Sequence, residues 1–173
     1  IEGTNVEALP LGTDGETAKR IVETTMVETQ ARGWYFNTDY YFPLLPDVNN
    51  FITMPPNTLR VDFGNTKFRH QYTLKNGKIY DMANHTFIIE TPLEADVIWL
   101  NDYQTLPPEA YEYIAFRAAR KFKQSVIGSI ETDSFTVRDE AESQINLKRR
   151  QLQSKTSSIQ TNKVNHKKHN IKI

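Results

Sequence analysis

The chain has 173 residues, 21 basic and 21 acidic side chains, and no cysteine. This length suits one ordinary domain or two small lobes that share a core. The absence of cysteine excludes disulfides, iron–sulfur clusters and thiolate zinc sites. The uninterrupted apolar run Val97–Leu100 is far too short to span a bilayer, and we expect no membrane association.

The neutral total charge hides an uneven distribution. Five lysines and no acid lie after Ser154, namely Lys155, Lys163, Lys167, Lys168 and Lys172. The rest of the chain therefore carries about five more acidic than basic residues. These counts predict an acidic body with a basic C-terminal arm.

The first expected element is a helix that begins near Thr13, because Thr13 and Glu16 have the spacing of a capping box. Gly33 suits the left-handed residue that ends many helices. An apolar stripe at steps of three and four predicts the buried face. Its members are Ala18, Ile21, Val22, Thr25, Met26 and Thr29.

An aromatic segment, ARGWYFNTDYYFPLLPDV, follows from Ala31. Trp34 and Phe36 alternate with Tyr35 and Asn37, as in a strand that leaves a helix. A ligand platform and a nucleic-acid stacking surface are alternatives, but large aromatic side chains are mostly buried. We therefore expect Trp34 and Phe36 to fill the junction between a helical part and a β part.

Short strands are expected from about residue 38 to residue 102. Four prolines between residues 43 and 56 forbid a long helix there. Asn76-Gly77 suits the type I′ turn of a β-hairpin. Further strand-like runs are FITM (51–54), LRVDF (59–63), TFIIE (86–90) and ADVIWL (95–100). About six short strands predict a small antiparallel barrel or sandwich.

Two more helices are expected after residue 103. Pro108 fits the first turn of one, where its missing N–H costs nothing. The other follows Thr132 and Asp133 and carries an apolar stripe of Val137, Ala141, Ile145 and Leu152. After Ser154 the polar and basic composition predicts an extended arm that does not fold alone.

Together these elements predict an α+β fold: an antiparallel helical bundle with an inserted small β-barrel or sandwich lobe and an extended C-terminal arm. The expected helical domain comprises residues 1–37 and 103–153, the β lobe residues 38–102, and the arm residues 154–173.

No pattern in the sequence predicts catalysis. The four histidines lack the spacing of metal ligands, and no P-loop, GxGxxG or GxSxG motif is present. We expect no catalytic residues, no cofactor and no metal. A barrel that binds single-stranded nucleic acid remains an alternative, with Lys67, Arg69 and Lys75 as its cationic candidates. A hydrolase with paired carboxylates, directed at host surface glycan, is another.

Five segments, in order from Ile1 to about Gln124, carry a family resemblance. They are IEGTNVEAL, ARGWYFN, LLPDVNNFITMPPNTLRVDF, LKNGKIYDMANHTFII and DYQTLPPEAYEYIAFRAARKF. In this order they resemble the tail tubular protein A family of short-tailed phages, although Asn57 stands where that family usually has an acid. The signature positions that we expect to be structural are Arg32, Gly33, Trp34, Phe36, Asn37, Pro46, Asp47, Gly77, Tyr80 and Asp81.

The resemblance implies a structural virion protein that is not an enzyme. Family members form a dodecameric head-to-tail adaptor, or gatekeeper, between the portal and the tail nozzle, and DNA passes through the ring without sequence recognition. The resemblance thus implies a location in the virion tail after assembly in the host cytoplasm, with tail fibres as a further partner. It also implies a helix before Ile1, so we expect residues upstream.

The basic C-terminal part is expected to bind the portal or a neighbouring subunit. A purely solvating tail has little use for apolar residues, yet this one contains some. An extended segment of this kind can add a strand to a partner's sheet edge. The residues expected to make the contact are Arg149, Arg150, Lys155, Lys163, Val164, Lys167, Lys168 and Ile171.

Overall fold

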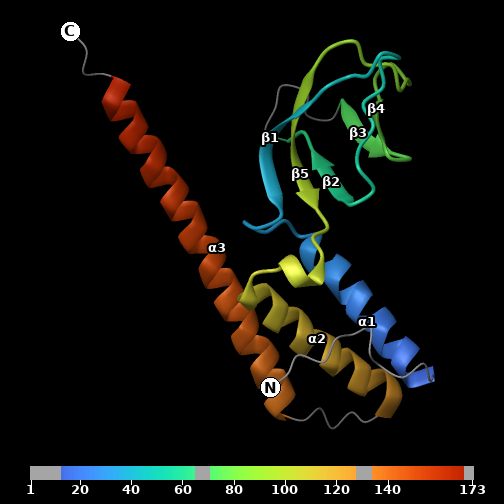
Figure 1. Cartoon of the computed structure of the whole chain (residues 1–173), viewed down its shortest axis with the longest axis vertical. Helices are drawn as coiled ribbons and strands as arrows, with labels where there is room; N and C mark the ends of the chain where they lie inside the picture. Colours follow the sequence, from blue (N-terminus) through green and yellow to red (C-terminus); the bar gives the residue numbers. More distant parts are fainter. Residues whose placement is uncertain (1–12, 65–70, 128–133, 170–173) are drawn as a thin grey trace. The chain divides into compact units, whose positions relative to one another are not determined.

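The computed structural model describes residues 13–64, 71–127 and 134–169, with side chains in 14–64, 71–125 and 136–154 (Figure 1). The elements in chain order are α1 (Thr13–Gln30), β1 (Thr38–Leu44), β2 (Thr58–Asp62), β3 (Tyr72–Lys75), β4 (Lys78–Asp81), β5 (Leu93–Trp99), the 3-10 helix η2 (Tyr103–Thr105), α2 (Pro108–Ile127) and α3 (Ser134–His169). The predicted mixture of helices and antiparallel sheet is confirmed. The chain divides into two compact units: unit 1 (1–26 and 103–173) and unit 2 (27–102).

Helix α1 has the face that its apolar stripe predicted. All six members of the stripe are buried or half-buried, whereas Lys19, Arg20 and Glu23 are exposed. The helix ends as expected: Gly33 has a φ of 77°, and its N–H donates to the carbonyl of Gln30 at 3.0 Å. A side chain at Gly33 is also excluded by space, because an added Cβ would lie 2.7 Å from Cδ1 of Ile98.

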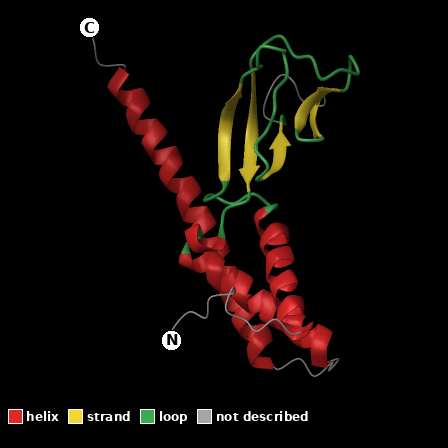
Figure 2. Cartoon of the chain, turned by 45° about the vertical axis from the view of Figure 1, so that its right-hand side comes forward, coloured by secondary structure: helices red, strands yellow, loops and turns green. Residues whose placement is uncertain are grey.

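Helices α2 and α3 form an antiparallel pair in unit 1, and they lie side by side in both views (Figures 1 and 2). Side-chain contacts match the end of α2 with the start of α3 and the start of α2 with residues further along α3. The pairs are Lys123 with Thr136, Arg120 with Glu140, Tyr113 with Gln144, and Glu109 with Arg150. Because Glu109 lies in the first turn of α2, the last five or so turns of α3 extend past that helix.

The expectation of an extended arm from residue 154 is wrong, because α3 continues to His169. Neither proline nor glycine occurs between Ser134 and His169, and lysine, arginine and glutamine are good helix formers. A helix satisfies its backbone hydrogen bonds internally, so a polar segment can extend an existing helix without burying apolar surface. Composition alone did not reveal this.

Unit 2 contains two antiparallel sheets, one of three strands in the order β1-β5-β2 and one formed by β3 and β4 (Figure 2). Both contribute to one apolar core, whose buried members are Leu44, Ile52, Met54, Phe63, Ile79, Ile89, Leu93, Ala95 and Val97. The described strands do not close into a barrel, so the barrel form of the prediction is wrong.

Two expected strands are also absent from unit 2. The FITM and TFIIE segments form only isolated bridges, between Thr53 and Lys78 and between Asp81 and Thr86. Prolines follow both segments closely and cannot donate to a strand ladder, which limits their pairing. The predicted hairpin is confirmed, since Asn76 and Gly77 between β3 and β4 have the positive φ values of 52° and 71° that a type I′ turn requires.

The segment from Trp34 to Asn37 is a turn and not the expected strand, because the N–H of Asn37 donates to the carbonyl of Trp34 at 3.1 Å. The side-chain oxygen of Asn37 accepts the N–H of Trp34 at 2.8 Å and closes the same turn. Trp34 is buried as predicted, and its indole N–H donates to the carbonyl of Thr29 at 2.7 Å. Phe36 is half-buried and meets the ring of Tyr35 edge-on.

The side-chain amide of Asn37 connects this turn to both neighbouring segments. Its nitrogen donates to the carbonyl of Gln30 at 3.0 Å and to the carbonyl of Trp99 at 2.7 Å. Gln30 and Asn101 exchange two further hydrogen bonds of 3.0 and 2.8 Å. The last turn of α1, the turn before β1 and the residues after β5 are therefore held together.

Replacing Trp34 by alanine should reduce the free energy of unfolding by about 3–5 kcal/mol, as truncation of large buried side chains does. Urea denaturation of the isolated chain measures this. Tyr40→Ala serves as the control, because Tyr40 is 55% exposed and its loss should change stability by about 0.5 kcal/mol or less. Equal losses for the two variants would contradict a structural role for Trp34.

Candidate interaction surfaces

The structure places the family-signature residues mainly at turns of unit 2. Gly33, Trp34, Phe36 and Asn37 form the turn after α1, next to the exposed Arg32. The other signature residues lie in the loop after β1 or in the β3–β4 hairpin: Pro46, Asp47, Gly77, Tyr80 and Asp81. Their side chains hold turns of the backbone or pack on neighbouring side chains. The rings of Tyr80 and Phe87, for example, have centroids 4.8 Å apart.

Asp47 organises the loop that follows β1. Its Oδ1 accepts the N–H groups of Asn49 and Phe51 at 2.8 and 2.9 Å, and its own N–H donates to the carbonyl of Phe51 at 2.8 Å. This defined turn displays two apolar side chains to solvent, Leu45 at 67% and Val48 at 97% exposure. Exposed apolar side chains mark an interaction site when they gather into a larger patch, so the neighbouring residues of β1 matter here.

A β-bulge in β1, the strand that precedes this loop, exposes two aromatic side chains. The register between β1 and β5 shifts between Asp39 and Phe42, and Tyr41 there has a φ of 55°. A positive φ at a bulky residue costs of order 1 kcal/mol, and here the Tyr41 N–H donates to Oδ1 of Asp96 at 3.1 Å. Tyr40 and Tyr41 are 55% and 59% exposed, and β1 is an edge strand.

We call Tyr40, Tyr41, Leu45 and Val48 the β1 ridge. Residues 38–50 contain two acids, Asp39 and Asp47, and no basic residue. A third carboxylate belongs to Glu94, the register partner of Pro43 on β5. The β1 ridge is therefore a set of exposed apolar side chains with carboxylates near them in sequence and in strand register.

The apolar stripe of α3 also lies in solvent, although an apolar stripe ordinarily forms the buried face of a helix. Val137, Ile145 and Leu152 are 46%, 56% and 67% exposed, and Ala141 is exposed as well. The buried face of α3 instead carries Ser143 and Leu147, at 3% and 0% exposure, with the paired Glu140 beside them. The buried face could have been recognised from a small residue and an ion-paired residue at helical spacing, Ser143 and Glu140. The spacing of apolar residues alone did not indicate it.

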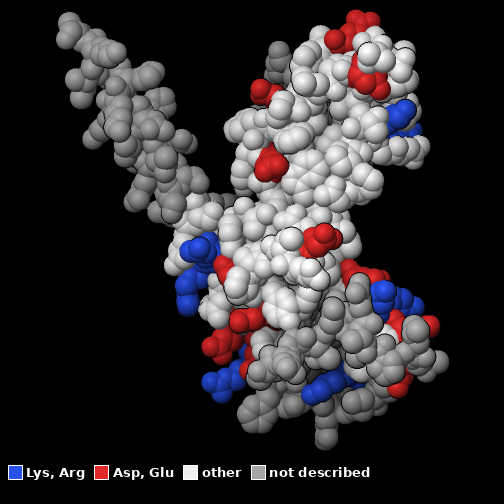
Figure 3. Space-filling view, in the orientation of Figure 1, with Lys and Arg blue, Asp and Glu red and all other residues white. Residues whose placement is uncertain are grey.

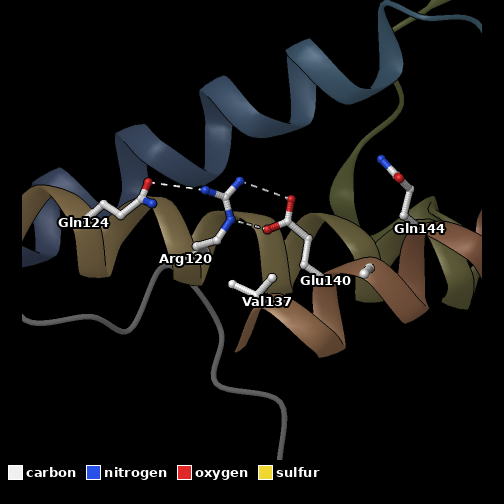
Figure 4. Close-up of a pocket in the computed structure, with 6 residues that line it drawn as sticks. Arg120, Gln124, Val137, Glu140 and Gln144 are labelled. Atoms are coloured by element: carbon white, nitrogen blue, oxygen red, sulfur yellow. Dashed lines mark hydrogen bonds and ion pairs between the residues drawn. The ribbon is translucent and has the colours of Figure 1, made fainter. Parts of the chain in front are cut away.

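A hollow of about 340 Å³ lies along the start of this stripe (Figure 4). Its lining comes from α2 and α3: Arg120, Gln124, Val137, Glu140, Ala141 and Gln144. Arg120 donates to both carboxylate oxygens of Glu140, and this ion pair raises the pKa of the Arg120 guanidinium. Its two apolar lining residues, Val137 and Ala141, already belong to the stripe, so the hollow adds polar groups beside them, with the charges of Arg120 and Glu140 paired to each other.

Of the residues predicted to bind a partner, Arg149 and Arg150 have described side chains. Arg149 donates to Asn146 at 3.4 Å, and Arg150 lies 3.4 Å from Glu109 while remaining 59% exposed. The structure thus leaves both cations at the surface. The side chains of Lys155, Lys163, Val164, Lys167 and Lys168, and the whole of Ile171, lie outside the described residues.

The remaining candidate chemistry within the described ranges concerns metal ions, membranes and nucleic acid. No group of three or more histidine, aspartate or glutamate side chains there gathers closely enough to hold a metal ion. Likewise, no helix in the described part of the chain is both long enough and apolar enough to cross a bilayer. Lys75 lies over the ring of Tyr80 at 4.6 Å, while Lys67 and Arg69 fall outside the described residues.

Comparison with known families places this chain in one of them. The family model described as tail tubular protein matches residues 4–157. The chain belongs to the tail tubular protein family. This tail tubular protein is therefore a structural component of a phage tail, in agreement with the resemblance of its five segments. No curated protein matches it at a level that would mark a relative.

Asp81, one of the signature residues, organises the turn after β4. Burial by itself raises the pKa of the Asp81 carboxyl, but hydrogen bonds hold the pKa below its ordinary value of 3.8. The donors are the backbone and side chain of Asn84, the side chain of Gln71 and the backbone of Ala83.

Because the folded pKa of Asp81 is lowered, the carboxylate stabilises the fold above pH 3.8, and this contribution is lost as the pH falls through the folded value. Asp81→Asn should therefore be less stable than the natural chain at pH 7, and the difference should shrink at low pH. Urea denaturation from pH 7 down to about pH 2.5 measures it. The exposed Glu90→Gln variant controls for loss of one carboxylate, and a difference constant with pH would contradict the assignment.

Proposed function

We propose that this tail tubular protein is a ring-forming head-to-tail adaptor, or gatekeeper, that joins the portal to the tail nozzle. Family membership over residues 4–157 is the observation that carries the proposal. In this role the chain forms a dodecameric ring, contacts portal and nozzle, and offers a docking place for tail fibres. Exposed apolar side chains in both units support a function made of contacts with other proteins.

The charge of the chain suits a wall along the path of DNA. Residues 27–102 hold nine acidic and six basic residues, and the first 154 residues together carry about five more acids than bases. On the face seen in Figure 3, the blue of lysine and arginine in unit 2 gathers over the β3–β4 hairpin, and red appears at several other places. An acidic surface repels phosphates, so DNA passes without being held and without sequence recognition.

The basic end of α3 is assigned to protein contact in this proposal, with the portal or a neighbouring subunit as the partner. Since α3 is helical to His169, the mode of contact is a helix in a groove and not an added strand. A segment that grips DNA inside the conduit would slow ejection, whereas lysines that meet carboxylates of a partner would steer assembly.

Deletion of the residues after Gln153 tests this assignment. We expect the shortened chain to fold, because the buried Leu147 and the contacts between α2 and α3 remain. Its attachment to the portal should be lost, and particles assembled with it should leak DNA. Binding to isolated portal and to double-stranded DNA would be measured separately, at two salt concentrations. Unchanged portal binding with weaker DNA binding would assign the segment to nucleic acid.

The oligomeric state is expected to depend on the portal. The chain alone should sediment as a monomer or weak associate, and a ring should form when portal is added, because assembly on a template keeps rings from closing in the wrong place. Sedimentation velocity with and without portal distinguishes the two states. A stable ring without portal would contradict templated assembly, and no ring under either condition would contradict the adaptor function.

A further inference from the structure

Two sets of exposed apolar side chains on this chain lie beside charges of opposite sign, the second over the C-terminal half of its length. The first is the β1 ridge of unit 2, bordered by carboxylates. The second is the α3 stripe of unit 1, formed by Val137, Ala141, Ile145 and Leu152. Each surface belongs to its own compact unit, and each leaves apolar side chains in water, where burial against a partner would be favourable.

The charge beside the α3 stripe changes along its length: Arg138, Asp139 and Glu142 are exposed beside the first half, and the excess of positive charge lies beside the second half. No acidic residue occurs in the chain after Glu142, whereas Lys148, Arg149 and Arg150 lie between Ile145 and Leu152 in sequence. Lys148 donates to the neutral side chain of Gln144 at 3.3 Å, and Arg149 to the neutral Asn146. Because these acceptors are neutral, they do not compensate the positive charges of Lys148 and Arg149.

The β1 ridge is preorganised to receive such a surface. Asp47 holds its loop through two backbone N–H groups, and Asp96 holds the bulge through the N–H of Tyr41. A rigid surface loses little conformational entropy on binding, which favours affinity. Its carboxylates at Asp39, Asp47 and Glu94 match the cations of the α3 stripe.

We propose that the α3 stripe of one copy of this chain packs on the β1 ridge of the next copy, in a head-to-tail contact that repeats around the ring. This inference rests on the proposed ring function and names the surfaces that build it. A contact between two different patches leaves both satisfied only when the chain of subunits closes, which is the property of a ring. Ridge against ridge would bring carboxylates together, whereas the ridge against the second half of the stripe pairs carboxylates with Lys148 and Arg149, so charge favours the heterologous pairing.

Because the chain has no cysteine, single introduced cysteines report the contact directly. Val48→Cys and Leu152→Cys chains are prepared separately, mixed in equal amounts with portal protein, and oxidised. We expect a disulfide between the two different variants at least tenfold more often than between two identical ones. Since each chain carries one cysteine, a disulfide within a chain is impossible.

Ile88→Cys replaces Val48→Cys in the control, because Ile88 is an exposed apolar residue of unit 2 outside the β1 ridge, at 51% exposure. Rings that form without a Val48–Leu152 disulfide, or with equal cross-linking through Ile88, would overturn the proposed contact and leave the adaptor function standing. Absence of rings, with portal present and in the natural chain, would overturn both.

A charge exchange provides a second test that does not depend on oxidation. Arg149→Glu and Glu94→Lys should each lower ring assembly at least tenfold, because each places like charges across the contact. The chain with both substitutions should recover assembly, since the pairing is restored with the signs reversed. Single variants that assemble normally, or a double variant no better than either single one, would contradict the assignment. Urea denaturation of each isolated variant verifies that folding is unchanged.

Discussion

The side-chain amide of Asn37 is the constraint on which the arrangement of unit 2 depends. One small group accepts the N–H of Trp34 and donates to the carbonyls of Gln30 and Trp99, so it fixes the end of α1, the entry to β1 and the exit from β5. Each such hydrogen bond contributes about 1 kcal/mol net, but a buried partner left unsatisfied costs about 1–3 kcal/mol. No other amino acid has both the acceptor and the two donors at this length of side chain.

This anchoring explains how unit 2 can hold a strained and exposed surface. With both ends of the strand segment fixed, β1 pairs with β5 in one register, and the bulge at Tyr41 is stabilised by Asp96. A positive φ at Tyr41 costs free energy, and so do four apolar side chains in water. The surrounding hydrogen bonds and the apolar core of unit 2 offset both costs. Strained backbone conformations persist where many surrounding contacts hold them in place, and they are concentrated at functional positions.

The sequence was informative wherever a local rule acts alone. The Asn76-Gly77 turn, the glycine end of α1 and the start of α2 at Pro108 each follow from the chemistry of one or two residues. The family resemblance was equally readable, because it rests on short segments in a fixed order. Trp34 was placed correctly in the interior, although its neighbours form a turn that depends on the side chain of Asn37 and not on alternation.

What the sequence did not reveal depends on packing between elements distant in the chain. The exposed face of α3 could not be recognised from apolar spacing, because Arg120 on α2 selects the face that carries Glu140 and Ser143. The bulge in β1 requires knowledge of Asp96, which is 55 residues from Tyr41. Similarly, the continuation of α3 to His169 follows from the absence of a helix-breaking residue, which a compositional reading as a disordered arm overlooks.

An electron cryomicroscopy reconstruction of assembled tails can show whether this chain forms the proposed ring between portal and nozzle. We expect twelve copies of a subunit with two antiparallel sheets and a long α3 in a closed ring directly below the portal, with acidic residues toward the channel. Density for this fold in the fibres or at the distal end of the tail, with another protein filling the portal junction, would contradict it.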